Sequence, residues 1–176
     1  MKQGILILNV FLLILCACDG PNETSANENL EQQEVQESLK ITEKSIEEFQ
    51  FTDYVLSSDG EKAVSNWEKY QELAIQISYL KKADLSFFNG ESNLITEFIE
   101  EFKSNVPEDL ETNPIVSRVV VLETAMYRLN ANLTLDNIED EEKLMSVKAV
   151  LVAFSNLNNQ INKKLERDIY DRITVE

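Results

Sequence analysis

The chain of 176 residues is strongly acidic: 32 aspartates and glutamates against 16 lysines and arginines give a formal net charge of −16. It contains no histidine, and its two cysteines are Cys16 and Cys18. This composition excludes histidine-based catalytic triads, most zinc sites and the common forms of haem ligation, and the charge disfavours nucleic acid as a partner. Carboxylates, hydroxyls, lysines and arginines remain, and none forms a recognisable catalytic constellation, so we expect no catalytic residue, metal site or cofactor.

The N-terminus carries Lys2 and then an apolar run from Gly4 to Ala17, interrupted by Asn9. This run is shorter than the roughly 20 apolar residues that a membrane-spanning helix needs, and its length is typical of a signal-peptide core. It ends in Leu15-Cys16-Ala17-Cys18, which resembles the lipobox of bacterial lipoproteins.

The resemblance implies that residues 1–17 are a signal peptide, cleaved after Ala17, and that the thiol of Cys18 carries a diacylglycerol. Cys16 fits the lipobox less well, because the bulky Leu15 would precede it. Processing would remove both thiols from the chemistry of the protein, which leaves no intrachain disulfide and no cysteine nucleophile. A soluble secreted protein and an uncleaved anchor are the alternatives.

Residues 18–37 are acidic and rich in amides, and Leu30 and Val35 are their only large apolar side chains. Such a segment buries too little apolar surface to offset the entropy of ordering, so we expect a flexible tether. Asp19 after the cysteine resembles the inner-membrane retention signal of some bacterial lipoproteins, whereas acidic tracts accompany surface export in others. Inner membrane, outer membrane and cell surface therefore all stay open.

Residues 38–176 show helical periodicity and are predicted to form one all-α domain. A first helix is expected at 36–51, either packed on the domain or belonging to the tether, and residues 51–56 are expected to be a connector that packs down. A second helix starts near Ser58, which has capping-box spacing to Glu61, and runs through Lys82. A third runs from Ser92 to Asn105 and is stopped by Pro107.

The two remaining helices carry the clearest apolar seams. Asn113 as cap and Pro114 as first residue open the fourth helix, which we favour over a valine-rich strand because its seam continues to Leu133. The last helix begins near Asp136, with capping-box spacing to Glu139, and at about 50 Å long is expected to overhang its neighbours. Short connections favour an up-down bundle of four main helices, with or without the N-terminal one.

Four side chains are weak candidates for partner binding: Arg118, Asn158, Asp136 and Glu139. Arg118 can clamp an anion between helices, although an ion pair with Glu123 or a neighbouring helix is favoured. Asn158 interrupts the last seam, where it can line a polar pocket or, as we favour, set the helix register or lie at the edge of the seam. The acidic run 136–142 has the oxygen ligands of a calcium site, but it lacks the glycine and spacing of a calcium loop.

Aromatic residues offer one further possibility, which is a ligand-binding box. The residues concerned are Trp67, Tyr70, Phe87 and Phe88. Aromatic residues at helical spacing more often belong to a hydrophobic core, so we favour a core position for these four.

Three functions remain compatible with the sequence. We favour a lipid-anchored envelope protein whose bundle is a protein-interaction or structural module, with the membrane (through Cys18) and an unidentified envelope protein as partners and no nucleic acid. The alternatives are an inhibitor or immunity protein for a basic partner, and a carboxylate-based carrier of a small ligand or metal, or an enzyme.

Overall fold

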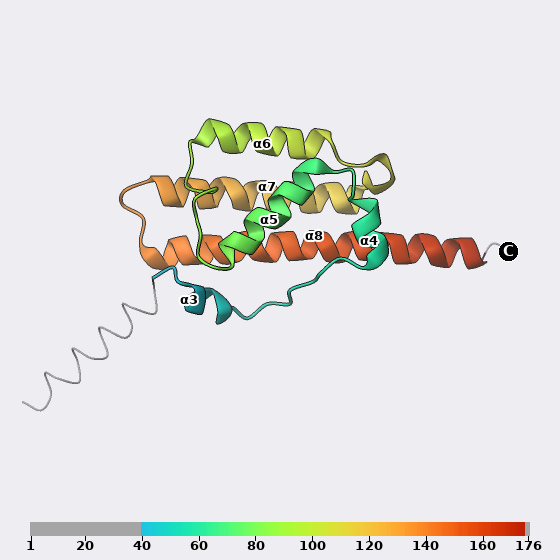
Figure 1. Ribbon diagram of the computed structural model, residues 1–176, viewed down its shortest axis with the longest axis horizontal. Coiled ribbons are helices and arrows are strands. Elements are labelled where there is room, and N and C mark those ends of the chain that lie inside the picture. The colour runs from blue at the N-terminus through green and yellow to red at the C-terminus, as the bar shows by residue number, and fades with distance from the viewer. Residues whose placement is uncertain (1–39, 175–176) are drawn as a thin grey trace, which may run out of the picture. The chain divides into compact units, whose positions relative to one another are not determined.

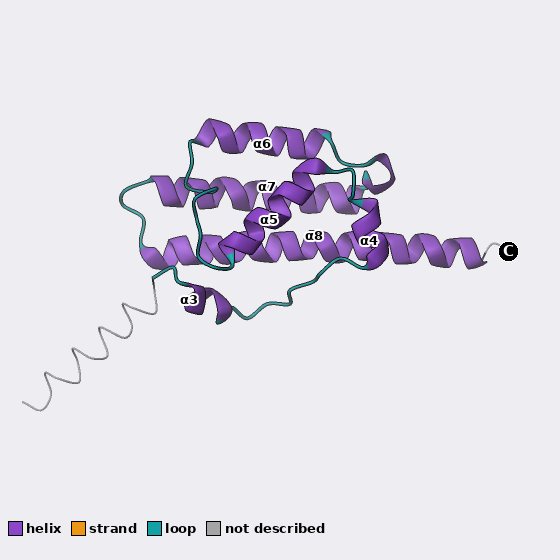
Figure 2. Cartoon of the chain, viewed as in Figure 1, coloured by secondary structure: helices purple, strands orange, loops and turns teal. Residues whose placement is uncertain are grey.

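The computed structural model describes residues 40–174. The predicted signal peptide, Cys18 and the tether lie outside these residues. The described part is all helical and contains no strand (Figure 2), which confirms the predicted all-α bundle. Its elements are α3 (Glu43–Glu47), α4 (Ser58–Ala63), α5 (Glu68–Leu80), α6 (Ser92–Ser104), the 3₁₀ helix η1 (Glu108–Leu110), α7 (Asn113–Thr134) and α8 (Asp140–Thr174).

The four long helices α5 to α8 run in alternating directions, and α5 lies obliquely across the others in this view (Figure 1). The most extensive pairing is between α7 and α8. Both predicted seams are in the core, where the α7 positions Ile115, Val119, Leu122, Met126 and Leu129 are buried. The helical interpretation of this valine-rich stretch is therefore correct.

The predicted second helix is broken into α4 and α5, and its cap is Ser57 rather than Ser58. The Ser57 hydroxyl accepts a hydrogen bond from the Gly60 N–H at 3.1 Å. The break falls at Ser65, whose hydroxyl donates to the Lys62 carbonyl at 2.8 Å, because serine competes for backbone partners inside a helix. The break also sets Trp67 fully in the core, where its indole N–H donates to the Phe102 carbonyl at 3.0 Å.

Three other predicted boundaries are wrong. Within residues 40–51 the helix is confined to α3, because Thr42 caps it and the chain then leaves the helix to run beside α8. The cap of α7 is Thr112, so Pro114 is the second helical residue. Helix α8 begins at Asp140 instead of Asp136, because residues 135–139 reverse the chain between two antiparallel helices.

Helix α5 ends in a local backbone motif that was not predicted from the sequence. Ala83 has a φ of 62°, and its N–H donates to the Leu80 carbonyl while the Asp84 N–H donates to that of Tyr79, both at 3.0 Å. This is a Schellman motif, in which glycine is the usual left-handed residue. Hydrogen bonds from the Ser86 hydroxyl and N–H lower the pKa of Asp84 in the following turn.

Polar side chains inside the bundle join its elements. The Asn130 amide donates to the Phe88 and Gly90 carbonyls at 2.9 and 2.8 Å, which fixes the α5–α6 connection on α7. Asn132 donates to the Ser146 hydroxyl at 2.6 Å and links α7 to α8. Within residues 40–174, every buried side-chain nitrogen and oxygen has a hydrogen-bond partner, so the core carries no uncompensated polar group.

Candidate interaction site at the strap and cleft

Residues 52–57, which we call the strap, connect α3 to α4 and run alongside α8 (Figure 2). Three polar side chains of α8 bind the backbone of the strap: Ser155, Asn158 and Asn162. Their spacing of three and then four residues places them on one face of the helix. The strap is therefore held by a row of polar side chains rather than by helix or strand pairing.

The hydrogen bonds of this row are short and reciprocal. The Ser155 hydroxyl accepts from the Tyr54 N–H at 2.7 Å and donates to the Thr52 carbonyl at 2.6 Å. Asn158 donates to the Tyr54 carbonyl at 3.0 Å. Asn162 donates to the Val55 carbonyl at 2.8 Å and accepts from the Ser57 N–H at 2.9 Å. Every strap atom in these bonds belongs to the backbone, so they leave the strap side chains unused, and the Val55 side chain is 75% exposed.

Asn158 has a second role, because its side-chain oxygen accepts the Tyr70 hydroxyl at 2.7 Å. Burial raises the pKa of Tyr70 far above its ordinary value near 10, and the negative charge of Glu61 adds to this effect. Tyr70 therefore stays protonated at neutral pH and donates a hydrogen bond to Asn158. Its ring stacks on Phe154 with centroids 5.4 Å apart, which ties α5 to α8 below the strap.

A cleft of about 430 Å³ opens between the strap and α5. Its buried lining is apolar and aromatic, with Val64, Ile77 and Phe154 beside the Tyr70 ring. Its polar lining consists of Asp53, Glu61, Tyr70, Gln71, Ser78, Lys81 and Asn158. An ion pair between Lys81, which directly follows α5, and Asp53 of the strap joins the two walls. The cleft thus combines an apolar interior with charged groups at its edge.

Gly60 lets α4 approach α8 closely at the end of the strap. A Cβ atom at this position would lie 2.9 Å from the Asn162 side-chain oxygen and 3.1 Å from Leu56 Cδ2. The Asn162 oxygen is not free to move away, because it accepts the Ser57 N–H. Glycine is therefore required by contact rather than by backbone conformation.

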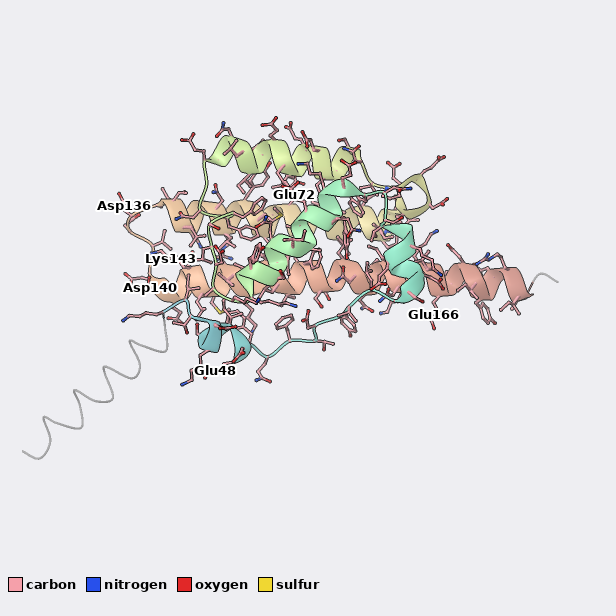
Figure 3. All side chains as sticks on the ribbon, in the orientation of Figure 1. Glu48, Glu72, Asp136, Asp140, Lys143 and Glu166 are labelled. Carbon is pink, nitrogen blue, oxygen red and sulfur yellow. The ribbon has the colours of Figure 1, made fainter. Side chains whose placement is uncertain are left out.

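Of the four side chains predicted as candidates for partner binding, the structure brings only Asn158 into this site. Arg118 is exposed on α7. Among the ion pairs of residues 40–174, the Glu123 carboxylate pairs with Lys103 of α6 at 3.0 Å, and neither the predicted pair of Arg118 with Glu123 nor one with a neighbouring helix is formed. Asp136 and Glu139 are exposed in the turn between α7 and α8. Figure 3 shows Asp136 at that turn, at the opposite end of α8 from Glu166. Because α8 begins at Asp140, the predicted capping box is also wrong.

The aromatic residues divide between core and cleft. Trp67 and Phe88 are fully buried and Phe87 is half-buried, so they form part of the core, and Tyr70 alone of the four lines the cleft. Among residues 40–174, no group of three or more acidic, histidine or cysteine side chains is placed to hold a metal ion.

The sequence analysis predicted residues 51–56 as a connector that packs down, but it missed Ser155, Asn162 and Gly60, and with them the way in which the strap is held on α8. The available signal was the spacing of Ser155, Asn158 and Asn162 beside the apolar seam of α8, of which only Asn158 was singled out. Their partners lie about a hundred residues away in the chain, so no local pattern indicates them.

Comparison with protein-family models, with curated proteins and with solved structures finds no match to this chain. No helix within residues 40–174 has the length and apolar character needed to span a bilayer.

Proposed function

We propose that this chain is a lipid-anchored protein of the bacterial cell envelope, facing away from the cytoplasm, whose helical bundle binds another envelope protein at the cleft. The anchor rests on Leu15-Cys16-Ala17-Cys18 and its position after an apolar run of signal-peptide length. Lipid chains on Cys18 would supply stable attachment, since each buried methylene contributes about 0.8 kcal/mol.

The single observation that carries the interaction function is the cleft between the strap and α5. A concave site with an apolar lining and a few placed polar groups is the usual form of a binding site. Val64, Ile77 and Phe154 suit an apolar side chain, and the neighbouring Glu61 carboxylate suits a cation. The partner segment that fits this chemistry presents an apolar residue next to a lysine or arginine.

Binding accounts for the polar groups of the cleft better than catalysis does. The raised pKa of Tyr70 favours its protonated hydroxyl, which donates a hydrogen bond to the Asn158 side-chain oxygen and is therefore poorly suited to act as a base or a nucleophile. Asp53 is paired with Lys81, and these two side chains fix the walls of the cleft. Tyr70, Asp53 and Lys81 thus hold the walls of the cleft in place, and the Glu61 carboxylate remains to receive the cation of a partner.

The test is photo-crosslinking from two exposed valines in cells that produce the full chain. A photoreactive residue at Val55, in the cleft wall, should capture a defined protein, whereas one at Val121 on α7 should not. Glu61→Gln should lower the yield from Val55, and the control Glu108→Gln on η1 should leave it unchanged. Equal losses from the two substitutions would instead indicate general attraction of a basic partner by the acidic surface.

The anchor is tested separately with a fatty-acid probe. Cys18→Ser should abolish labelling and Cys16→Ser should retain it, because only Cys18 follows the small Ala17. Continued labelling of Cys18→Ser would overturn the anchor without affecting the assignment of the cleft.

A further inference from the structure

The C-terminal part of α8 extends past the other helices (Figure 1). Leu165 is the last α8 residue that packs partly against the core, and none of residues 166–174 is buried. We call these nine positions the overhang. Arg167 and Asp168 still border a hollow that Thr112 and Pro114 also line, but the overhang buries none of its side chains, which raises the question of what its apolar side chains contact.

An apolar stripe continues from the core onto the overhang. Leu165, Ile169 and Ile173 follow one another at intervals of four residues, so they lie on one side of the helix. Ile169 is 39% exposed and Ile173 is 69% exposed, and the neighbouring Tyr170 is 66% exposed. Exposed apolar side chains that adjoin one another mark a contact surface, whereas single ones do not.

The charges beside the stripe have both signs. Asp168 and Arg172 flank it on one side, and Glu166 flanks it on the other. A helix that lies on an anionic membrane carries mainly lysine and arginine on its polar face, which this segment does not. Mixed charges beside an apolar stripe are typical of a helix that packs on another helix.

We propose that the stripe binds a second copy of this chain, with the two overhangs antiparallel about a two-fold axis at Ile169. The axis places Ile169 against Ile169 of the second copy, and Leu165 against its Ile173. Asp168 lies one residue before the axis and Arg172 three residues after it, on the same side of the stripe, so the second copy's Arg172 lies about 3 Å from the level of Asp168 along the helix. The Asp168 carboxylate, which pairs with Lys164 of its own helix, is then close enough to pair with this Arg172 as well, and the two-fold axis repeats the contact. The stripe and one of its charged flanks are therefore complementary to themselves.

The position of the overhang also reduces the cost of bringing two acidic molecules together. The chain carries a net charge of −16, whereas the contact segment 165–173 is close to neutral, with two arginines against three acids. An overlap of the tips keeps the acidic bundles on opposite sides. Two such short segments cover less than the roughly 1,200–2,000 Å² of a standard interface, so the dimer should be weak and concentration-dependent.

The test is disulfide crosslinking of the full chain in extracts of cells that produce it, with Cys16 and Cys18 replaced by serine. Ile169→Cys should give a covalent dimer on mild oxidation, because the two-fold axis brings the thiols together. The control is Leu94→Cys on α6, an apolar position that is 57% exposed and so more accessible than Ile169 at 39%. A dimer yield several-fold above this control supports the proposal, and equal yields overturn it.

Charge exchange then tests the antiparallel arrangement. In the Ile169→Cys chain, Asp168→Arg or Arg172→Asp alone should lower the dimer yield several-fold, and the two together should restore it. A dimer yield that these substitutions leave unchanged overturns the antiparallel arrangement.

Sedimentation with vesicles of anionic phospholipid tests whether the stripe contacts lipid instead. If the full chain binds the vesicles, the double substitution Ile169→Asp with Ile173→Asp abolishes this binding, and no dimer forms, then the stripe contacts lipid and the proposal fails.

Discussion

The two sides of α8 hold their neighbours by different physical means. The side that faces α7 is an apolar seam, with Val147, Val150 and Leu157 fully buried. The side that faces the strap uses Ser155, Asn158 and Asn162 to bind backbone atoms. Apolar burial is non-directional and tolerates changes of shape, whereas a buried hydrogen bond requires its partner at a defined place.

This difference separates stability from specificity. The α7–α8 side supplies apolar burial that any well-packed pair of helices would give. The strap side fixes one backbone path, and with it the shape of the cleft. Substitutions on the first side should weaken the whole bundle, and those on the second should alter the strap as well.

The largest effect is expected from Leu122→Ala on α7. Leu122 is 1% exposed, and removal of a buried leucine side chain leaves a cavity that costs about 2–5 kcal/mol. The free energy of unfolding, measured in urea, should fall by this amount with an unchanged denaturant slope. The adjacent exposed Val121→Ala should change it by less than about 0.5 kcal/mol; similar losses from both would contradict the assigned seam.

Asn158→Ala should come next, at about 2–3 kcal/mol, because it leaves the buried Tyr70 hydroxyl and the Tyr54 carbonyl without partners. Unlike Leu122→Ala, it should also accelerate hydrogen exchange selectively at the amides of Tyr54 and Ser57. Asn156→Ala, on the exposed side of α8, is the matched control and should do neither. Uniform acceleration across all helices would show that the strap is not a separate structural unit.

The Tyr70–Asn158 contact should also make stability fall in alkali. The folded-state pKa of Tyr70 is raised, chiefly by burial, and the unfolded phenol titrates near 10. Below about pH 10 both states are protonated and the contribution is fully present; above it, only the unfolded state releases its proton. The free energy of unfolding should therefore drop by up to about 1.4 kcal/mol per pH unit above 10, and Tyr70→Phe should remove this component.

The same contrast explains which features were predictable from sequence. Helices α6 and α7 and the seam of α8 were predicted nearly in full, because burial along one face repeats in the sequence with the helical period. The starts of α4, α7 and α8 were misplaced by one to several residues because caps and turns depend on where the neighbouring helix must go. The strap was not predictable in detail, since its partners on α8 are tertiary. The lipid on Cys18 lies outside the described residues and stays a prediction.

Gly60→Ala should change the free energy of unfolding least. The sign of this change depends on whether the gain in helix propensity or the loss of contacts with Asn162 is larger. In an isolated helix the substitution stabilises by about 1 kcal/mol. Here the added Cβ would lie 2.9 Å from the Asn162 oxygen and 3.2 Å from Leu56 Cβ, and Asn162 can retreat only by breaking its hydrogen bonds to Val55 and Ser57. The lost contacts outweigh the helix propensity, so we expect a net destabilisation of about 1 kcal/mol in thermal or urea unfolding, with faster exchange at the Ser57 amide. In an Asn162→Ala background, where the obstructing side chain is absent, the same Gly60→Ala change should become neutral or stabilising. A loss that persists unchanged in that background would assign the requirement for glycine to Leu56 instead of to the polar row that holds the strap.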